Sequence, residues 1–260
     1  MKNILLGTFI IFSVTLCKPK KESENTEKIL SKSQIQLVKA PPSPAYLDSE
    51  LNLSDINFTA NDTSYLVYFN FDVKNYELGI ITADANDRGI ANSAKGQHIH
   101  LILDNEPYSA HYDPMAQKNL AKGQYVALAF LSRSYHESIK NKNSFILTTF
   151  DVESSKTFPY KFDKKGQHMF YSRPKGTYKG SDINNLLLDF FLINVTLGPD
   201  GNKVRATIND EVFLIDEWMP YYIQGLTPGI LTIKLELIDA DGILIEGPFN
   251  EVTRNVILSE

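Results

Sequence analysis

The chain has 260 residues and a formal net charge of −5, with 43% hydrophobic and 22% charged residues. The length allows one or two domains, and the composition is that of a folded protein. The negative charge argues against non-specific nucleic-acid binding, which needs a basic surface, so no nucleic-acid partner is expected.

The N-terminus has the pattern of an export signal. A single cation, Lys2, precedes an apolar run that ends at Leu16. This run is too short to span a bilayer and is typical of a secretory signal, so residues 1–16 are predicted to be a signal peptide.

The only cysteine of the chain, Cys17, directly follows this run. The sequence VTLC resembles a bacterial lipobox, in which the cysteine is lipidated and becomes the mature N-terminus, although a small residue usually stands in place of Leu16. The alternative is a soluble exported protein with a free thiol. We expect lipidation at Cys17, with a membrane as partner through the lipid anchor.

Residues 17–44 are predicted to form the lipidated cysteine and a flexible tether. Glu, Ser, Asn and Lys dominate this stretch, and three prolines stiffen its end. Such a segment buries too little apolar surface to fold alone.

Two predicted strands are copies of one another. GQHIHLILDNE lies in the first half of the chain and GNKVRATINDE in the second. Apolar residues alternate in both, which places one apolar row on one face of each strand. His98 and His100 of the first copy fall on Lys203 and Arg205 of the second. An internal repeat of this kind indicates two domains of similar architecture.

Further alternating or wholly apolar runs predict short strands around both copies, and no long 3.6-residue periodicity is present. The expected strands lie near residues 47–53, 67–73, 96–106, 124–132, 145–152, 186–197, 203–208, 230–238 and 252–258. The predicted fold class is all-β: two tandem immunoglobulin-like antiparallel β-sandwiches. They are predicted at residues 45–155 and 181–260, joined by a connection at 156–180, and they follow the disordered tether. We expect the connection to contribute an edge strand to the second domain.

Five runs carry a resemblance to a known family. They are GQHIHLILDNEPYSAHYDP, VALAFLSRSYHESIKN, YSRPKGTYKG, GNKVRATIND and EGPFNEVTR. Over about residues 45–260, the chain resembles a family of bacterial envelope lipoproteins whose members are sometimes labelled phosphopeptide-binding proteins. The resemblance implies an exported protein that is lipid-anchored in the cell envelope, in the outer membrane, with a peptide or anionic ligand. It brings no assigned catalytic residues.

A set of cations is predicted to bind such a ligand. Arg133, His136 and Lys140 lie just beyond the predicted central strand of the first repeat, and Arg173 and Lys175 lie in the connection. Their side chains could hold a phosphate or carboxylate by charge-assisted hydrogen bonds. The alternative for each segment alone is a charged hairpin tip or a solvated linker.

The histidine strand suggests a second kind of site. His98 and His100 are two residues apart on a predicted strand, so they share a face, and His111 or Asp113 follows as a third ligand. Two histidines at this spacing can bind one transition-metal ion. The alternative is a solvent-facing polar row, which the cations at the matching positions of the second copy favour.

The motifs of common enzyme classes are absent from the sequence. It has no Gly-x-Ser-x-Gly, no Walker loop, no His-Glu-x-x-His and no second cysteine besides Cys17. We therefore expect a non-enzymatic envelope lipoprotein that acts as a binding or interaction module for anionic ligands, phosphorylated or carboxylate. The alternative function is a transition-metal-binding envelope protein, and no cofactor other than that metal is expected.

Overall fold

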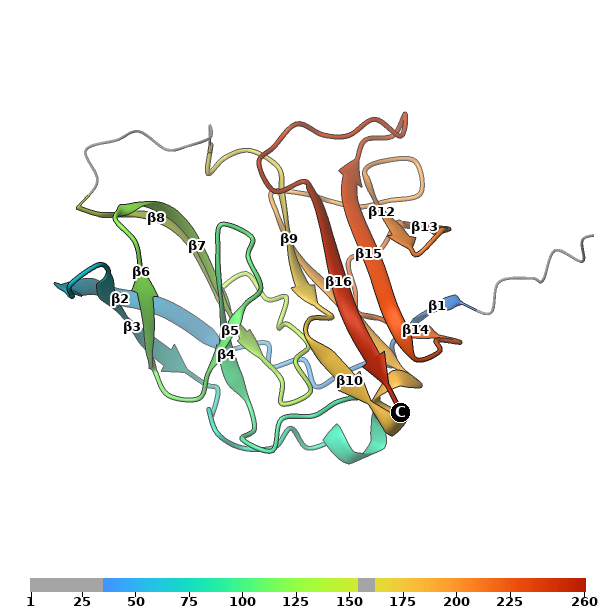
Figure 1. The fold of residues 1–260 in the computed structure, drawn as a ribbon, viewed down its shortest axis with the longest axis horizontal. Helices are drawn as coiled ribbons and strands as arrows, with labels where there is room; N and C mark the ends of the chain where they lie inside the picture. Colours follow the sequence, from blue (N-terminus) through green and yellow to red (C-terminus); the bar gives the residue numbers. More distant parts are fainter. Residues whose placement is uncertain (1–34, 154–161) are drawn as a thin grey trace, which may run out of the picture. The chain divides into compact units, whose positions relative to one another are not determined.

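The computed structural model describes residues 35–153 and 162–260 (Figure 1). The predicted signal peptide, Cys17, the tether up to residue 34 and part of the predicted connection lie outside these ranges. The described residues belong to one compact unit. Its described helices are the short 3-10 helices η1 (Ala85–Asp87) and η2 (Gly180–Ile183), and none in this part of the chain is long and apolar enough to cross a membrane.

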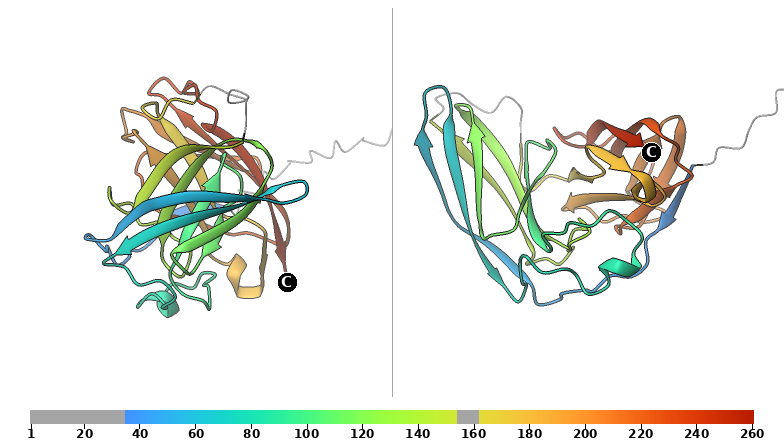
Figure 2. Two further views of the ribbon diagram at one scale, coloured as in Figure 1. Left: turned by 90° about the vertical axis from the view of Figure 1, so that its left-hand side faces the viewer. Right: turned by 60° about the horizontal axis from the view of Figure 1, so that its bottom comes forward.

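The first sandwich consists of two antiparallel sheets, with the strand orders β2-β3-β6 and β5-β4-β7-β8. Its strands are β2 (Glu50–Ala60), β3 (Tyr65–Lys74), β4 (His98–Leu103), β5 (Ser109–His111), β6 (Met115–Leu120), β7 (Gly123–Ser132) and β8 (Phe145–Val152). Figure 2 shows the long hairpin of β2 and β3, coloured blue to teal.

The core of the first sandwich follows from the predicted alternation. Ile99 and Leu101 of β4 are buried against Val67 and Phe69 of the facing sheet, together with Leu131 of β7. Because side chains on a strand alternate between faces, this apolar row leaves His98, His100 and Ile102 on the opposite face of β4.

The second sandwich has the sheet orders β1-β14-β11-β9 and β10-β16-β15-β12-β13. Its strands are β1 (Gln36–Lys39), β9 (His168–Arg173), β10 (Thr177–Lys179), β11 (Leu186–Ile193), β12 (Lys203–Ile208), β13 (Glu211–Ile215), β14 (Tyr221–Gln224), β15 (Gly229–Ile238) and β16 (Glu251–Ser259). The predicted fold class is correct: the chain is all-β, with two tandem sandwiches.

The two copies agree in their hydrogen bonds as well as in their sequence. β4 pairs with β7 so that Ile99 faces Leu131, and β12 pairs with β15 so that Val204 faces Leu237. The turns that follow β4 and β12 also match. The side chain of Asp104 accepts a hydrogen bond from the backbone N–H of Val126 in β7, and the side chain of Asn209 accepts one from the backbone N–H of Thr232 in β15.

Two predicted boundaries differ from the structure. The end of the predicted tether, residues 36–39, forms β1, which pairs with β14 and brings Leu37 against the core of the second sandwich. The predicted connection contributes β9 and β10, which are edge strands of the second sandwich. Both segments are short, and an open sheet edge satisfies their backbone groups, which no local sequence signal reveals.

The proline-rich segment between β1 and β2 is held by two buried arginines. Arg88 donates to the carbonyls of Pro41 and Pro42, at 2.7 and 2.6 Å. Arg133 donates to the carbonyl of Pro44, with its Nε at 3.1 Å. The segment predicted as the stiff end of a tether is therefore attached along its length.

A third apolar cluster joins the two sandwiches. Ile102 and Phe130 of the first sandwich pack with Phe170 and Phe191 of the second, and the rings of Phe130 and Phe191 stack with their centroids 4.9 Å apart. As a result, every residue of β4 is buried. The second sandwich thus covers the outer face of β4, where the two histidines lie.

Candidate metal centre

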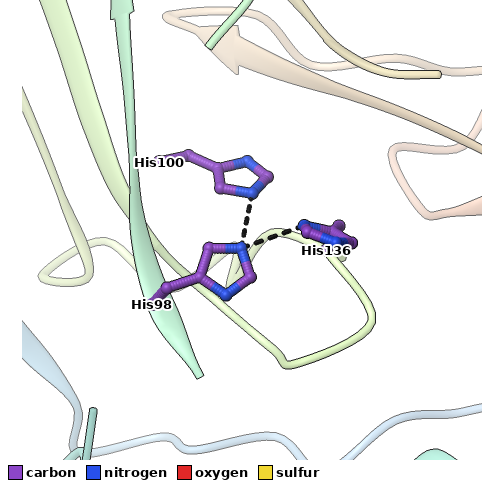
Figure 3. Close-up of side chains that lie close together, drawn as sticks. All are labelled: His98, His100 and His136. Atoms are coloured by element: carbon purple, nitrogen blue, oxygen red, sulfur yellow. Dashed lines mark hydrogen bonds between the residues drawn. The ribbon is translucent and has the colours of Figure 1, made fainter. Parts of the chain in front are cut away.

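Three histidines meet on the covered face of β4. His98 and His100 project to the same side of the strand, and His136 reaches them from the turn between β7 and β8 (Figure 3). The Nε2 atom of His98 lies 2.9 Å from Nε2 of His100 and 3.0 Å from Nδ1 of His136. We refer to these three residues as the trihistidine cluster.

The expectation that His98 and His100 form a solvent-facing polar row is wrong. Both side chains are fully buried, at 0% relative exposure, while His136 keeps partial contact with solvent. The sequence of β4 could not show this burial, because the cover comes from the second sandwich rather than from the strand itself.

His136 occupies a position that suits glycine. Its φ angle is 69°, and the matching residue of the second copy is Gly242, with a φ angle of 81°. In both copies the same backbone bond closes the turn, from Arg133 N to Glu137 O and from Asp239 N to Ile243 O, each 2.9 Å long. A left-handed conformation costs a non-glycine residue roughly 1–2 kcal/mol, and such strain collects at functional positions.

Burial keeps the three imidazoles neutral. It lowers the pKa of His98 to about 4, even though the carbonyl of Gly96 acts in the opposite direction. Burial also lowers the pKa of His100 and of His136, and the charge of Arg173 adds to the effect at each. Metal binding requires this neutral form.

The hydrogen bonds fix the proton of His98. Its Nδ1 lies 2.8 Å from the carbonyl oxygen of Gly96, which can only accept, so Nδ1 carries the proton and donates. In the neutral ring, Nε2 then has a lone pair and no proton. This lone pair faces nitrogen atoms of both His100 and His136.

One lone pair accepts one well-aligned hydrogen bond, so the protein atoms satisfy at most one of these two close contacts. A metal ion among the three nitrogens resolves both contacts, because each ring then directs a lone pair to the ion. Nδ1 of His100 would donate outward, toward Ser172 Oγ at 3.4 Å. Such outward hydrogen bonds are typical of metal-bound histidines.

The donor set fits a transition metal. The three ligand nitrogens lie within 4.8 Å of one another, and nitrogens about 3.3 Å apart surround a tetrahedral ion with bonds of 2.0–2.1 Å. Within the described residues, no thiolate or carboxylate belongs to the cluster. Imidazoles alone suit copper, zinc and nickel and are poor ligands for magnesium or calcium.

Tyr108 forms one wall of the cluster. Its ring stacks on His100 with the centroids 3.5 Å apart, and its hydroxyl lies 3.2 Å from Nδ1 of His136. Burial raises the pKa of this hydroxyl. The tyrosine therefore stays protonated.

The predicted third ligand, His111, is not part of the cluster. It pairs with Ile99 across β4 and β5, so its side chain lies on the face of the apolar row, and its Nε2 contacts Ser109 Oγ at 2.8 Å. The alternative ligand, Asp113, is exposed. The third histidine is His136, which the sequence interpretation had placed in the anion site.

The predicted anion site is divided in two. Arg133 forms an ion pair with buried Glu137 at 3.0 Å, and Lys140 pairs with buried Asp189 at 2.6 Å. Their charges are therefore already compensated, and they hold the turn and the contact between the sandwiches. The prediction that all five cations converge is not supported.

The other predicted cations do lie near the cluster. Lys175 Nζ donates a hydrogen bond to the backbone carbonyl of Tyr108 at 2.6 Å, and Ser172 Oγ lies 3.4 Å from Nδ1 of His100. The charges of Arg173 and Lys175 add to the effect of burial in lowering the pKa of His98 and of His136.

The repeat contains an indication that His136 has a special role. In the repeat, Ser132–Ser138 aligns with Ile238–Leu244, which places His136 on Gly242. A histidine at a turn position that the other copy gives to glycine indicates a role other than folding.

No protein-family model matches this chain, and no curated protein matches it. Among solved structures, it is similar to the fibronectin(III)-like modules of CbhA from Clostridium thermocellum, with 13% identity, 75% of this chain and 85% of that chain covered, and a TM-score of 0.28. It is also similar to the two tandem V-type regions of VCBP3, a v-region-containing chitin binding protein, with 7% identity, 82% and 99% covered, and a TM-score of 0.23. At these scores, neither likeness assigns a ligand to this chain. The molecule is a tandem β-sandwich protein with a buried trihistidine cluster.

Proposed function

We propose that this protein is a non-enzymatic binding module of the bacterial cell envelope that binds a transition-metal ion through His98, His100 and His136. The proposal rests on one observation: one nitrogen from each of three neutral imidazoles meets at one point. Nε2 of His98, which has a lone pair and no proton, lies next to a nitrogen of His100 and a nitrogen of His136. The proposal keeps the metal-binding alternative from the sequence and replaces its third ligand.

The charges around the cluster favour an ion of low charge. The three ligands are neutral, and Arg173 and Lys175 make the surroundings more positive. The cost of burying an ion rises with the square of its charge, so a cuprous ion is easier to bury here than a zinc ion. A divalent ion would need to bring an anion with it. We expect Cu⁺ to bind more tightly than Zn²⁺ or Ni²⁺.

The test is metal binding by the full chain, purified in detergent and freed of metal. We expect one equivalent of copper per chain, measured by competition with a chromophoric chelator. His136→Gly copies the second repeat, removes the ligand and relieves the strained turn. It should weaken copper binding at least about 100-fold, because losing a ligand costs more affinity than losing the residue to which a ligand donates its outward hydrogen bond. It should not lower the melting temperature.

The matched control is His111→Ala, which removes a histidine from the same sheet but from its other face, and should leave copper affinity unchanged. The proposal fails if the native chain binds no transition metal. It also fails if His136→Gly binds copper as tightly as the native chain does.

Anchoring in the envelope is part of the proposal and rests on the sequence of residues 1–17. Cys17→Ala should move the protein from the membrane fraction to the soluble exported fraction, because the lipid would have no attachment point. A variant that stays in the membrane fraction with its signal removed would contradict the anchor and leave the metal site untouched.

A further inference from the structure

A second site lies where the two sandwiches meet. It is a pocket of about 620 Å³ between residues 105–107, which follow β4, residues 175–176, between β9 and β10, and residues 252–255 of β16. We call it the Lys175 pocket. It contains none of the three histidines, although Lys175 also contributes to the positive surroundings of the trihistidine cluster.

Three cations lie in or behind this pocket. Lys175 and Arg254 line it, and Arg173 lies close enough to lower the pKa of Lys175. Arg173 and Arg254 are 6% and 9% exposed. In the described part of the chain, none of the three forms an ion pair.

This lack of counter-ions distinguishes the two arginines of the pocket from the other buried arginines of the described chain. Arg88 pairs with Asp84, and Arg133 pairs with Glu137. A buried cation without a counter-ion is costly, so two buried arginines beside the half-buried Lys175 indicate that a negative group from outside the chain completes the site.

The hydrogen bonds of the arginines are also incomplete. Arg254 donates through Nη2 to the carbonyl of Asn105 at 2.8 Å, while its Nη1 is buried and has no partner. Nε of Arg173 is likewise buried without a partner. Buried donors of this kind are rare in folded proteins and mark places where a ligand or water belongs.

Aromatic rings hold the cations in place without neutralising them. Lys175 Nζ lies 3.9 Å from the ring centroid of Tyr108, and the guanidinium of Arg254 lies 4.4 Å from that of Tyr171. Such contacts contribute about 0.5–2 kcal/mol each, less than a counter-ion would. Burial and the neighbouring arginines still lower the pKa of Lys175 to about 8.

The nearest carboxylate on the pocket wall is Glu106. It is exposed and forms no ion pair with Arg254, whose pKa is lowered by burial although the charge of Glu106 acts in the opposite direction. It therefore leaves the pocket positive. Pro107, Gly176 and Val252 give the wall an apolar part beside the cations.

We propose that the Lys175 pocket binds a small organic anion, whose oxyanion head contacts Lys175 and Arg254 and whose apolar body lies against Pro107 and Val252. The head is a carboxylate or a phosphate, since both accept charge-assisted hydrogen bonds from lysine and arginine.

Four probes separate the head from the body: acetate, benzoate, inorganic phosphate and phenyl phosphate, each titrated into the full chain and followed by the backbone amide signals. We expect the signals of Gly176 and Thr253 to shift. Benzoate should bind more tightly than acetate, and phenyl phosphate more tightly than phosphate, because the ring buries apolar surface. The better head identifies the source of the anion.

Lys175→Gln should weaken the best probe roughly 10- to 100-fold, as the loss of a charged hydrogen-bond partner does. It should fold at least as stably as the native chain, because it removes a repelling charge. Lys175→Arg should retain binding, and Lys122→Gln, which removes an exposed charge elsewhere, should not change it. The proposal is overturned if no probe binds, if the shifts lie outside the pocket, or if Lys175→Gln binds as the native chain does.

Discussion

The strands β4 and β12 have the same place in the two sandwiches and opposite surroundings. Both bury one apolar row in their own sandwich. The second row of β4 carries His98 and His100, fully buried, while the second row of β12 carries Lys203 and Arg205, which are half-buried. Across the sheet, His100 faces Phe130, whereas Arg205 faces Glu236 and binds it as an ion pair.

The turns next to these strands differ in the same way. In the first sandwich, the turn presents His136 to the covered face of β4 and holds its Arg133 to the proline-rich segment. In the second, Asp239 and Gly242 make a simple acidic turn with the same backbone bonds. The repeat thus supplies the scaffold twice, and the cluster forms only in the copy that the other sandwich covers.

The strongest way to break this comparison is to place the second row of β12 on β4. His98→Lys with His100→Arg would bury two cations without counter-ions, each costing about 3–5 kcal/mol. We expect a loss of more than about 6 kcal/mol in the free energy of unfolding, which is enough to unfold a typical domain. Urea denaturation measures it, and a double variant within 0.5 kcal/mol of the native chain would show that the face is open to solvent.

The turns give the next largest effect. Arg133→Gln leaves the carboxylate of Glu137 buried without its partner and frees the carbonyl of Pro44, so we expect a loss of about 3–5 kcal/mol. Asp239→Asn, at the matching position, keeps the side-chain acceptor of the turn and should cost less than about 1 kcal/mol. Equal losses in denaturant unfolding would contradict the different roles assigned to the two turns.

Acid should act on the first sandwich before the second. The folded-state pKa of His98 is about 4, below its ordinary value of 6.5, so the unfolded chain binds more protons between these values. Stability from the buried neutral ring is complete above pH 6.5 and is lost as the pH falls toward 4, on the order of 3 kcal/mol.

In the second sandwich, Arg205 lowers the pKa of Glu236 to about 2, so the stability from this pair is present above pH 4.5 and is lost only as the pH falls toward 2. Melting of the metal-free chain between pH 7 and pH 4 checks the order. His98→Gln should lose less stability than the native chain as the pH falls from 7 to 4. If the variant loses as much stability as the native chain, groups other than His98 cause the loss.

The smallest effect is expected for the reverse exchange. Lys203→His with Arg205→His changes a half-exposed row, and Lys234 still pairs with the buried carboxylate of Glu236, at 3.0 Å, after Arg205 is replaced. We expect a change within about 1 kcal/mol, measured by denaturant unfolding beside the first double variant. A large loss here would mean that the outer face of β12 is as constrained as that of β4.

Much of the fold could be predicted from the sequence, because the alternation of apolar and polar residues can be recognised within each strand without knowing which other strands it contacts. The strands β8 and β12 begin and end where the pattern places them. The short strand β1 was missed, and the connection was expected to add one edge strand to the second sandwich but contributes two, β9 and β10, since their places depend on open sheet edges elsewhere in the chain.

The sequence by itself determined the two copies of one sandwich, the buried apolar row of each and the pair of histidines on one face of β4, since these follow from residue spacing. Only the tertiary structure decided that this face is buried, that His136 rather than His111 completes the cluster, and that Arg133 and Lys140 are paired while Lys175 and Arg254 are not. Those outcomes depend on which distant surfaces meet, and a charge or an imidazole gains its role from the groups that surround it after the two sandwiches have packed together.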